Sequence, residues 1–312
     1  MNKVQSKSAF SLIELSIVIL IIGILIAGVT QGSRLVSAFR ISNARAITNS
    51  SDVNSISGLV LWLEPTMENS FAISSVPVTP SILTDVDEPN NNAGIGRWND
   101  RNPQSLIKNH ATQTVALFQQ PLYKTGAING LPALYFNSRE ATATDHYLVS
   151  SLNIDYTELN DVTIFMVYQL STANSNTNYC LLGNDNGSFD RFLCPRYAPN
   201  STTGTTSSGS TNVTVSAINT TAATIASMVL RNGGASNSSA VYVNGASAAT
   251  FTESHSNSGT SNFYIGAVGN SSPTGFFNGY IAECIVFNRA LKNEERRDVE
   301  KYLSNKWGIK IS

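Results

Sequence analysis

The stretch that decides the organisation of this chain is Phe10-Ser-Leu-Ile-Glu-Leu-Ser-Ile-Val-Ile-Leu-Ile-Ile-Gly-Ile-Leu-Ile-Ala-Gly-Val-Thr30. It follows a short polar segment, residues 1–9, which contains two lysines. As an α-helix the stretch would be roughly 31 Å long, at ~1.5 Å per residue, and the hydrocarbon core of a bilayer is about 30 Å thick. The segment is therefore long enough to cross a membrane, and Glu14 is its only charged residue.

Glu14 distinguishes this segment from a plain secretory signal peptide, which the basic residues before an apolar stretch would otherwise suggest. A carboxylate inside a membrane span costs ~2.5 kcal/mol or more and usually marks a function with a definite partner. If the chain were cut between Ala9 and Phe10, Phe10 would carry a new α-amino group. In a helical assembly that amine could pair with Glu14 of a neighbouring subunit, so two charges that are unfavourable alone would become compatible with lipid when subunits dock.

The same residues resemble the prepilin N-terminus of type IV pilins and type II secretion pseudopilins. The resemblance rests on the basic leader, the small residue Ala9 and the run Phe10-Ser-Leu-Ile-Glu-Leu15. It implies cleavage after Ala9 by a prepilin peptidase, N-methylation of Phe10, and assembly with other pilin or pseudopilin subunits through the helix. It departs from the family in having Ala9 where Gly is usual and no proline within the apolar helix.

The resemblance also implies a location. The segment would anchor the protein in the bacterial cytoplasmic (inner) membrane, with the C-terminal part outside, in a surface pilus or a periplasmic pseudopilus. Charge alone does not orient the span, because two lysines precede it and three arginines, Arg34, Arg40 and Arg45, follow it closely. Apolar residues continue among these arginines and no proline occurs before Pro65, so the helix is expected to extend to about residue 50.

From Ile56 the pattern changes to short apolar runs separated by Gly, Asn, Asp, Ser and Pro, which is typical of strands and turns. The predicted strands are 59–63, 133–136, 162–168, 225–230, 240–243, 263–266 and 279–287. Asn129-Gly130, Asn244-Gly245 and Asn278-Gly279 supply residues that tolerate positive φ at tight turns. The domain organisation is then a leader over 1–9, a hydrophobic helix over 10–50 and an antiparallel β-sandwich over 56–312.

The end of the chain returns to helical spacing. Its apolar positions are Val299, Tyr302, Leu303 and Trp307. Asn293 is expected to cap this helix, Gly308 to end it, and Trp307 to pack on the sandwich. The predicted fold class is mainly β: a long N-terminal transmembrane α-helix, an antiparallel β-sandwich of jelly-roll type, and a short C-terminal helix.

Several segments of the large domain resemble bacterial LamG-like, concanavalin A-type jelly rolls. They are 58–64, 98–100 with 110–113, 129–136, 241–245 and 279–291, so the resemblance covers most of residues 56–311. It implies the fold much more than a function, because this architecture carries lectins, adhesins, glycosidases and plain spacers. Many such domains bind Ca²⁺ through one Asp and loop carbonyls. Asp100, Asp185 and Asp190 are the candidates here, although an Asp at such a position commonly forms a turn instead.

Composition and motifs argue against two other classes of protein. The chain of 312 residues has 20 Lys+Arg and 21 Asp+Glu, and only 13% of its residues are charged, so it lacks the basic stripe of a nucleic-acid-binding protein. A glycosidase needs two carboxylates facing its substrate. The nearest set, Asp85, Asp87 and Glu88, precedes Pro89 and three asparagines and is expected in a solvated loop. The three histidines, His110, His146 and His255, are scattered, so we expect no enzyme activity.

Two of the three cysteines, Cys180 and Cys194, are predicted to form a disulfide. Each lies seven residues from Gly187, the centre of an expected hairpin, and opposed residues of an antiparallel pair come close to disulfide reach. An exported domain also meets an oxidising compartment. Two reduced core cysteines, or a hairpin register shifted by one residue, are the alternatives. Cys284 lies inside an apolar run and is expected to be a buried free thiol.

The sequence thus favours a membrane-anchored minor pilin or pseudopilin that displays a jelly-roll binding or adhesion domain, with a glycan or a matrix protein as its ligand. The alternative is a carbohydrate-binding or adhesive surface protein on a plain signal anchor that never polymerises. Glu14 discriminates between the two, because only a polymerising protein needs it.

Overall fold

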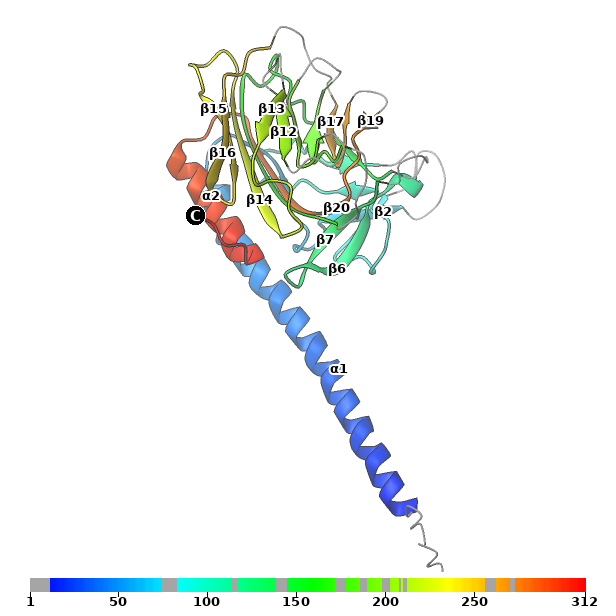
Figure 1. The fold of residues 1–312 in the computed structure, drawn as a ribbon. Coiled ribbons are helices and arrows are strands. Elements are labelled where there is room, and N and C mark those ends of the chain that lie inside the picture. The colour runs from blue at the N-terminus through cyan, green and yellow to red at the C-terminus, as the bar shows by residue number, and fades with distance from the viewer. Residues whose placement is uncertain are drawn as a thin grey trace, which may run out of the picture. The chain divides into compact units, whose positions relative to one another are not determined.

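The computed structural model describes residues 12–74, 83–113, 117–138, 145–171, 178–185, 190–197, 203–207, 209, 212–255, 262–269 and 273–312 (Figure 1). The chain forms two compact units, Met1–Asn43 and Ala44–Ser312. The boundary falls inside helix α1 (Leu12–Asn49), so the last six residues of this helix belong to the second unit. The predicted cleavage site at Ala9 and Phe10 lies outside the described residues.

Helix α1 runs without a break for 38 residues, because the sequence offers it no proline. Its side chains from Leu12 to Val29 are almost all apolar and all exposed. The helix ends at Asn49, just before the serines that follow, and a short 3₁₀ turn η1 (Asp52–Asn54) leads into the sandwich. The expected extension to about residue 50 is confirmed.

The second unit is built from two large sheets in which all named strands pair antiparallel. The first, called sheet A, has the order β16-β15-β14-β9-β20-β7-β6, with β1 also pairing with β20. Its strands are β1 (Leu59–Leu63), β6 (Leu122–Ile128), β7 (Leu131–Phe136), β9 (Asp161–Leu170), β14 (Thr224–Arg231), β15 (Ser239–Val243), β16 (Ala246–Phe251) and β20 (Gly279–Phe287).

The second sheet, called sheet B, is made of shorter strands in the order β13-β12-β11-β10-β17-β8-β5-β4-β2-β3. They are β2 (Phe71–Ser74), β3 (Leu83–Val86), β4 (Arg97–Trp98), β5 (Ala111–Thr112), β8 (Leu148–Ser150), β10 (Leu182–Gly183), β11 (Phe192–Cys194), β12 (Gly204–Ser207), β13 (Asn212–Val215) and β17 (Phe263–Ile265). A small pair, β18 (Val268–Gly269) and β19 (Pro273–Thr274), and a 3₁₀ turn η2 (Leu117–Gln119) complete the β-rich part.

The predicted fold class is confirmed. All seven strands expected from the sequence are present, and β1 and β20 have the expected bounds. Asn129-Gly130 and Asn244-Gly245 form hairpin turns with positive φ at both residues. The third expected turn, Asn278-Gly279, is wrong: Gly279 is the first residue of β20, where a Cβ would collide with the carbonyl oxygen of Gln169.

Sheet A is buried on both faces, which explains its nearly continuous apolar runs. Along β9, Ile164, Met166 and Tyr168 pack into the core between the two sheets. The alternate residues Phe165 and Val167 pack into a second core on the other face of the sheet. Because successive side chains of a strand point to opposite faces, one strand serves both cores.

The second core lies beneath helix α2 (Asn293–Trp307) and the end of α1 (Figure 1). The predicted apolar face of α2 is confirmed, with Trp307 fully buried, and Gly308 ends the helix with φ 62°. The predicted cap is wrong by one residue, because Lys292 and not Asn293 occupies the cap position. The Lys292 backbone N–H donates to Glu295 Oε2 at 2.9 Å, so the acidic first turn still holds the start of the helix.

Candidate functional site

The first candidate surface is the exposed apolar part of helix α1. Its large side chains from Leu12 to Val29 are 50 to 87% exposed, and its most apolar stretch has a mean hydropathy of 2.9. Glu14 lies in the first described turn. The hydroxyl of Ser16 donates to the carbonyl of Ile13 at 2.8 Å, which satisfies this polar group within the helix. Exposed apolar surface on this scale requires lipid or other apolar helices around it.

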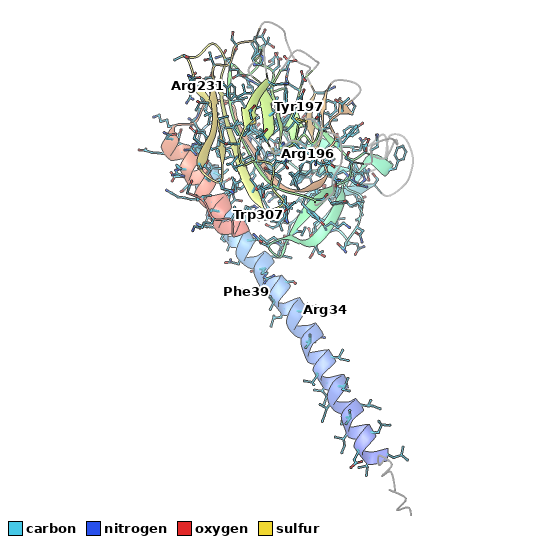
Figure 2. The ribbon with its side chains drawn as sticks, in the orientation of Figure 1. Arg34, Phe39, Arg196, Tyr197, Arg231 and Trp307 are labelled. Carbon is cyan, nitrogen blue, oxygen red and sulfur yellow. A yellow bond between two sulfur atoms is a disulfide. The ribbon has the colours of Figure 1, made fainter. Side chains whose placement is uncertain are left out.

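The helix keeps exposed apolar residues beyond the expected span. Leu35 and Phe39 are each 72% exposed, and they lie among Arg34 and Arg40. Figure 2 labels Arg34 and Phe39 on this exposed part of helix α1. A surface that alternates apolar and basic side chains suits contact with neighbouring subunits or with lipid headgroups outside the hydrocarbon core.

The last residues of α1 are fixed to the sandwich unit. Ala44 is buried, and Thr48 contacts Tyr302 of α2, with 3.3 Å between Oγ1 and the phenol oxygen. Arg45 Nε donates to the carbonyl oxygen of Thr66 at 2.7 Å. The junction therefore combines apolar burial with side-chain hydrogen bonds, which fix the end of α1 against α2 and the segment after β1.

A buried charged network lies beneath this junction. Lys306 Nζ is 2.9 Å from Glu64 Oε1 and 3.0 Å from Glu283 Oε2, and all three side chains are buried. Glu283 also accepts hydrogen bonds from the indole N–H groups of Trp62 and Trp307, each at 2.7 Å. Two carboxylates thus share one ammonium group, and indole donors supply part of the remaining stabilisation.

The electrostatics of the network favour the charged form of Glu64. Burial alone would raise the pKa of Glu64, but the positive charge of Lys306 and hydrogen bonds from Thr66 outweigh it and hold that pKa below the ordinary range. The pKa of Tyr302 is raised, first by burial and then by the nearby carboxylates Glu283 and Glu64. Tyr302 therefore keeps its proton and donates a hydrogen bond to Glu283 Oε1, at 2.6 Å. We find no signal in the sequence that would have revealed this network.

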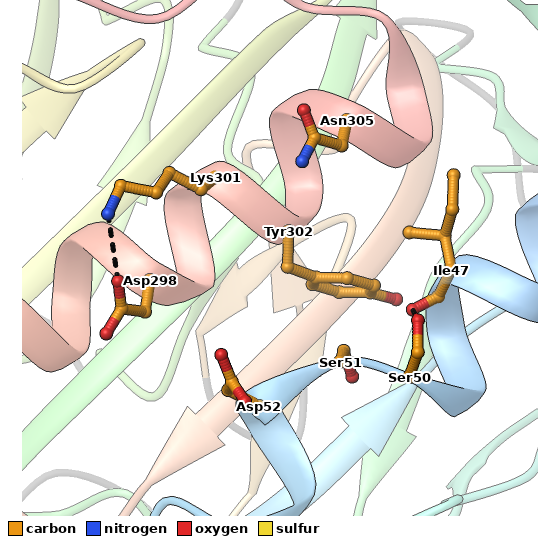
Figure 3. A pocket seen from close by; sticks show the side chains of 8 residues that line it. All are labelled: Ile47, Ser50, Ser51, Asp52, Asp298, Lys301, Tyr302 and Asn305. Atoms are coloured by element: carbon orange, nitrogen blue, oxygen red, sulfur yellow. Dashed lines mark hydrogen bonds and ion pairs between the residues drawn. The ribbon is translucent and has the colours of Figure 1, made fainter.

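A cavity of about 270 Å³ opens beside the junction (Figure 3). Ile47, Ser50, Ser51 and Asp52 line it from the end of α1 and the following turn, and Asp298, Lys301, Tyr302 and Asn305 line it from α2. Figure 3 shows the ring of Tyr302 reaching from α2 toward Ile47 and Ser50. Lys301 pairs with Asp298 at 3.0 Å in an exposed ion pair. The lining is polar and carries no arrangement of nucleophile and base.

Of the three carboxylates considered for catalysis, Asp87 and Glu88 follow β3 as exposed residues outside any strand, which confirms the expected loop for these two. Asp85 was expected in a loop, but it lies in the edge strand β3. There it accepts hydrogen bonds from Arg97 Nη2 at 2.7 Å and from the Asn99 amide at 2.9 Å. Burial alone would raise the pKa of Asp85, but these donors lower it. The chain forms a strand here because residues 83–86 extend the edge of sheet B beside β2.

Of the three candidate metal ligands, Asp100 has a clear structural role. Its carboxylate accepts hydrogen bonds from the backbone N–H groups of Trp62, Asn102 and Asn109, each at 2.9 Å. It thereby organises the loop after β4. Asp185 Oδ1 lies 3.4 Å from the backbone nitrogen of Asp190, well away from the Asp100 loop along sheet B. Within the described ranges, no group of three or more His, Cys, Asp or Glu residues is arranged to hold a metal ion.

Asp190 is followed in the sequence by Arg191, which belongs to a second buried charged cluster that was not predicted from the sequence. Arg191 is buried, and its Nε donates to Glu253 Oε1 at 2.8 Å. His255 Nε2 lies 2.7 Å from the same oxygen, and its ring stacks on Tyr156 with centroids 5.0 Å apart. Burial alone would raise the pKa of Glu253, but His255 and Arg191 lower it. Arg191 also donates to the carbonyl oxygens of residues 154, 159 and 160, so the cluster clamps the loop before β9.

The structure joins Cys180 and Cys194 by a disulfide, and Cys284 is a buried free thiol whose pKa is raised by burial. The expected pairing register was wrong by one residue, because Leu182 pairs with Leu193, so the two cysteines are not directly opposed. A bend at Leu181 compensates for this shift. Leu181 and Leu182 both pack into the inner core, and Cys180 therefore shares the outer face with Cys194.

Comparison with known proteins then identifies the two parts of the chain. A profile of the prokaryotic N-terminal methylation motif matches residues 5–30. A profile of the concanavalin A-like lectin/glucanases superfamily matches residues 141–295. The chain carries an N-terminal methylation motif, as type IV pilins do, and a LamG-like domain. Both resemblances noted in the sequence are thereby confirmed.

Solved structures share only a general likeness with this pilin-like protein. A Trypanosoma rangeli sialidase in complex with the inhibitor DANA is 16% identical, with a TM-score of 0.47, and the match covers 78% of this chain and 33% of the sialidase. The binding domain of Paraclostridial Mosquitocidal Protein 1 is 12% identical, with a TM-score of 0.46, and the match covers 82% and 56%. The pilin-like protein thus spans about a third of the sialidase, and these similarities are too low to assign a function.

A third structure, domain 4 of AbnA, a GH43 extracellular arabinanase from Geobacillus stearothermophilus in complex with arabinotriose, is 17% identical, with a TM-score of 0.40. That match covers 59% of the pilin-like protein and 81% of the arabinanase domain. A search of curated proteins finds no match. The methylation motif and the apolar helix α1 together support membrane anchoring of the pilin-like protein.

Proposed function

We propose that the protein is a minor pilin or pseudopilin subunit that is anchored in the bacterial cytoplasmic membrane and displays its sandwich outside as an adhesive binding domain. The observation that carries this proposal is the methylation motif over residues 5–30, which leads directly into an exposed apolar helix with Glu14 in its first described turn. In this proposal residues 1–9 are the leader, residues 10–50 the assembly helix and residues 56–312 the displayed domain.

The length of helix α1 supports both anchoring and assembly. Its 38 residues are about 57 Å long at ~1.5 Å per residue, nearly twice the about 30 Å of a hydrocarbon core. The helix can therefore span the membrane with its apolar part and continue outward through the stretch that exposes Leu35 and Phe39. That outer stretch would contact the helices of neighbouring subunits, which include other pilins.

The burial and the partners of the carboxylates described above support a binding role over a catalytic one. Glu64 and Glu283 are buried against Lys306, and Asp100 is saturated by backbone donors. A glycosidase needs carboxylates that face a substrate cavity. The displayed domain is therefore proposed to bind a glycan or a matrix protein without transforming it.

The leader provides the first test. We expect mass spectrometry of the membrane-extracted protein to find an N-methylated Phe10 as the first residue, because the proposed cut lies between Ala9 and Phe10, within the matched motif. Retention of Met1, or a cut after Ala27, would remove the prepilin part of the proposal and favour a plain signal anchor.

Glu14 provides the second test, which separates a polymerising subunit from a non-polymerising surface protein. We expect Glu14→Val to abolish incorporation into sheared filaments while the protein remains in the membrane fraction, because the amine of a neighbouring subunit loses its partner. The matched control is Ser16→Ala, since the Ser16 hydroxyl bonds only within its own helix turn at 2.8 Å. Absence of both variants and the unmodified protein from the filament fraction would support the signal-anchored alternative, and equal incorporation of all three would contradict the proposed role of Glu14.

A further inference from the structure

The outer face of sheet B carries a small cluster that neither the assembly helix nor the junction explains. In β11, Leu193 packs into the core between the sheets, whereas its neighbours Phe192 and Cys194 point to the opposite face. There they meet Val268 and the partly buried Tyr197. Sheet A has its outer face covered by α2, but here the outer face holds an aromatic and disulfide cluster of its own.

A cavity of about 110 Å³ is hollowed into this cluster. Its apolar wall is formed by Phe192, Tyr197 and the disulfide. The rings of Phe192 and Tyr197 lie nearly parallel, with an interplanar angle of 19° and centroids 6.3 Å apart. Phe192 is buried and packs against the half-buried Tyr197, whose ring lines the cavity.

The rest of the cavity wall is polar. Asn178 supplies an amide, Asp185 a carboxylate and Thr274 a hydroxyl, and they lie before β10, after β10 and in β19. An amide and a hydroxyl both donate and accept hydrogen bonds, and a carboxylate accepts them. A fixed aromatic face beside a few convergent polar groups is the usual composition of a site for a small polar ligand.

A neutral sugar ring matches this composition. A pyranose has an apolar face of C–H groups, which packs on an aromatic ring, and a rim of hydroxyl groups that donate and accept hydrogen bonds. The cavity, at about 110 Å³, is smaller than a whole pyranose ring with its hydroxyl groups, so it would take one side of a single terminal sugar residue and not an oligosaccharide.

The charges around the cavity exclude an acidic sugar. Among the described residues that line it, two have ionisable side chains: the carboxylate of Asp185 and the phenol of Tyr197. The two lining cysteines are joined in the disulfide. The nearest cation along the chain, Arg196, is buried and lies over the ring of Tyr179 at 5.8 Å. It does not line the cavity, so the carboxylate of an anionic sugar would meet Asp185 with no positive charge to offset the repulsion.

We propose that this cavity is a binding site for the terminal residue of a neutral glycan, with Tyr197 as the stacking platform and Asn178, Asp185 and Thr274 as hydrogen-bonding groups. The inference rests on the proposed adhesive function and locates its ligand site. The disulfide forms the base of the cavity, so it fixes the segment of Asn178 relative to β11 before any ligand arrives. Such preorganisation lowers the entropic cost of binding.

The test uses the full chain in detergent micelles and saturation-transfer NMR with five free sugars: glucose, galactose, mannose, N-acetylglucosamine and sialic acid. We expect transfer to at least one neutral sugar, strongest at the protons of one ring face, and none to sialic acid. Tyr197→Ala should raise the dissociation constant about tenfold, whereas Tyr197→Phe, which keeps the ring, should change it less than about threefold.

The matched control is Tyr280→Ala, which removes a partly buried ring from sheet A, where Tyr280 packs on Tyr135 with centroids 5.2 Å apart. It should leave sugar binding unchanged. Tryptophan fluorescence confirms that each variant is folded. Transfer to sialic acid alone, no transfer to any neutral sugar, equal binding by Tyr197→Ala, or binding that requires added Ca²⁺ would each overturn the proposal. The assay needs no filament, so its outcome is independent of the Glu14 test of assembly.

Discussion

The apolar part of helix α1 and the charged network beneath α2 are opposites in composition and exposure. In α1, one carboxylate stands among large apolar side chains that are 50 to 87% exposed. Beneath α2, Glu64 and Glu283 are 0 and 1% exposed and share Lys306. The first region is explained only by molecules outside the chain, and the second is satisfied within it. Substitutions in α1 should therefore change association, and substitutions beneath α2 should change the free energy of unfolding.

The strongest test of this difference removes the shared cation. We expect Lys306→Met to lower the free energy of unfolding by about 3 to 5 kcal/mol, because it leaves two buried carboxylates without their ion-pair partner. Urea unfolding of the full chain in micelles measures it through Trp62, Trp98 and Trp307, the three tryptophans of the protein, all of which are buried in the sandwich unit.

The matched control is Arg40→Met, which makes the same kind of change on the exposed part of α1. It should alter the unfolding of the sandwich by no more than about 0.5 kcal/mol. If both variants unfold at the same urea concentration as the unmodified protein, the network does not stabilise the domain and the comparison fails.

The disulfide on sheet B gives a smaller effect at a different site of the sandwich. The bridge closes a loop with a sequence separation of 14, so Cys180→Ala is expected to lower the free energy of unfolding by about 3 kcal/mol. A non-reducing peptide map of natively exported protein checks the bridge itself. One alkylated thiol, Cys284, is expected after denaturation without reductant, and alkylation of all three cysteines would contradict the pairing.

The smallest effect on the free energy of unfolding is expected for the ion pair of Arg289 and Glu295, at the partly exposed start of α2. Hydrogen bonds from Arg289, at 2.6 and 2.8 Å, are the main cause that lowers the pKa of Glu295 to about 2. A lowered pKa means that the pair stabilises the protein above the ordinary Glu pKa of about 4.3 and loses this effect as the pH falls toward 2.

We therefore expect Glu295→Gln to reduce the free energy of unfolding by up to about 1 kcal/mol at pH 7, with the difference from the unmodified protein vanishing toward pH 2. Urea unfolding at a series of pH values measures both. A difference that stays constant across this range would show that the ion pair is not its source.

Local sequence patterns predict the fold well and the sites unevenly. The long strands of sheet A were predictable because both of their faces are buried, which makes each a continuous apolar run such as Gly279–Phe287. Most strands of sheet B, by contrast, are only two to four residues long, and segments such as Arg97–Trp98 carry no periodic signal. The apolar helix α1 was predictable because the methylation motif and the apolar run lie within one short segment.

The network beneath α2 could not be predicted because its parts are distant in the sequence. Glu64, Glu283 and Lys306 meet only after β1 has paired with β20 and α2 has packed over both. A register irregularity between Ile281 and Glu283 changes which face of β20 the carboxylate occupies. The cavity on sheet B is equally non-local, and the bend at Leu181 that compensates for the shifted cysteine register has no signal in the sequence.

The junction at the end of α1 has a mechanical consequence. Strand β1, whose strand partner is β20, begins with Leu59 opposite Phe287, so a pull on the preceding chain would unzip the pair one hydrogen bond at a time. Arg45 and Thr48, which precede β1 in the sequence, contact Thr66 and Tyr302. Tension transmitted along the helix is therefore borne first by α2 and the segment after β1, which shields the first strand from peeling.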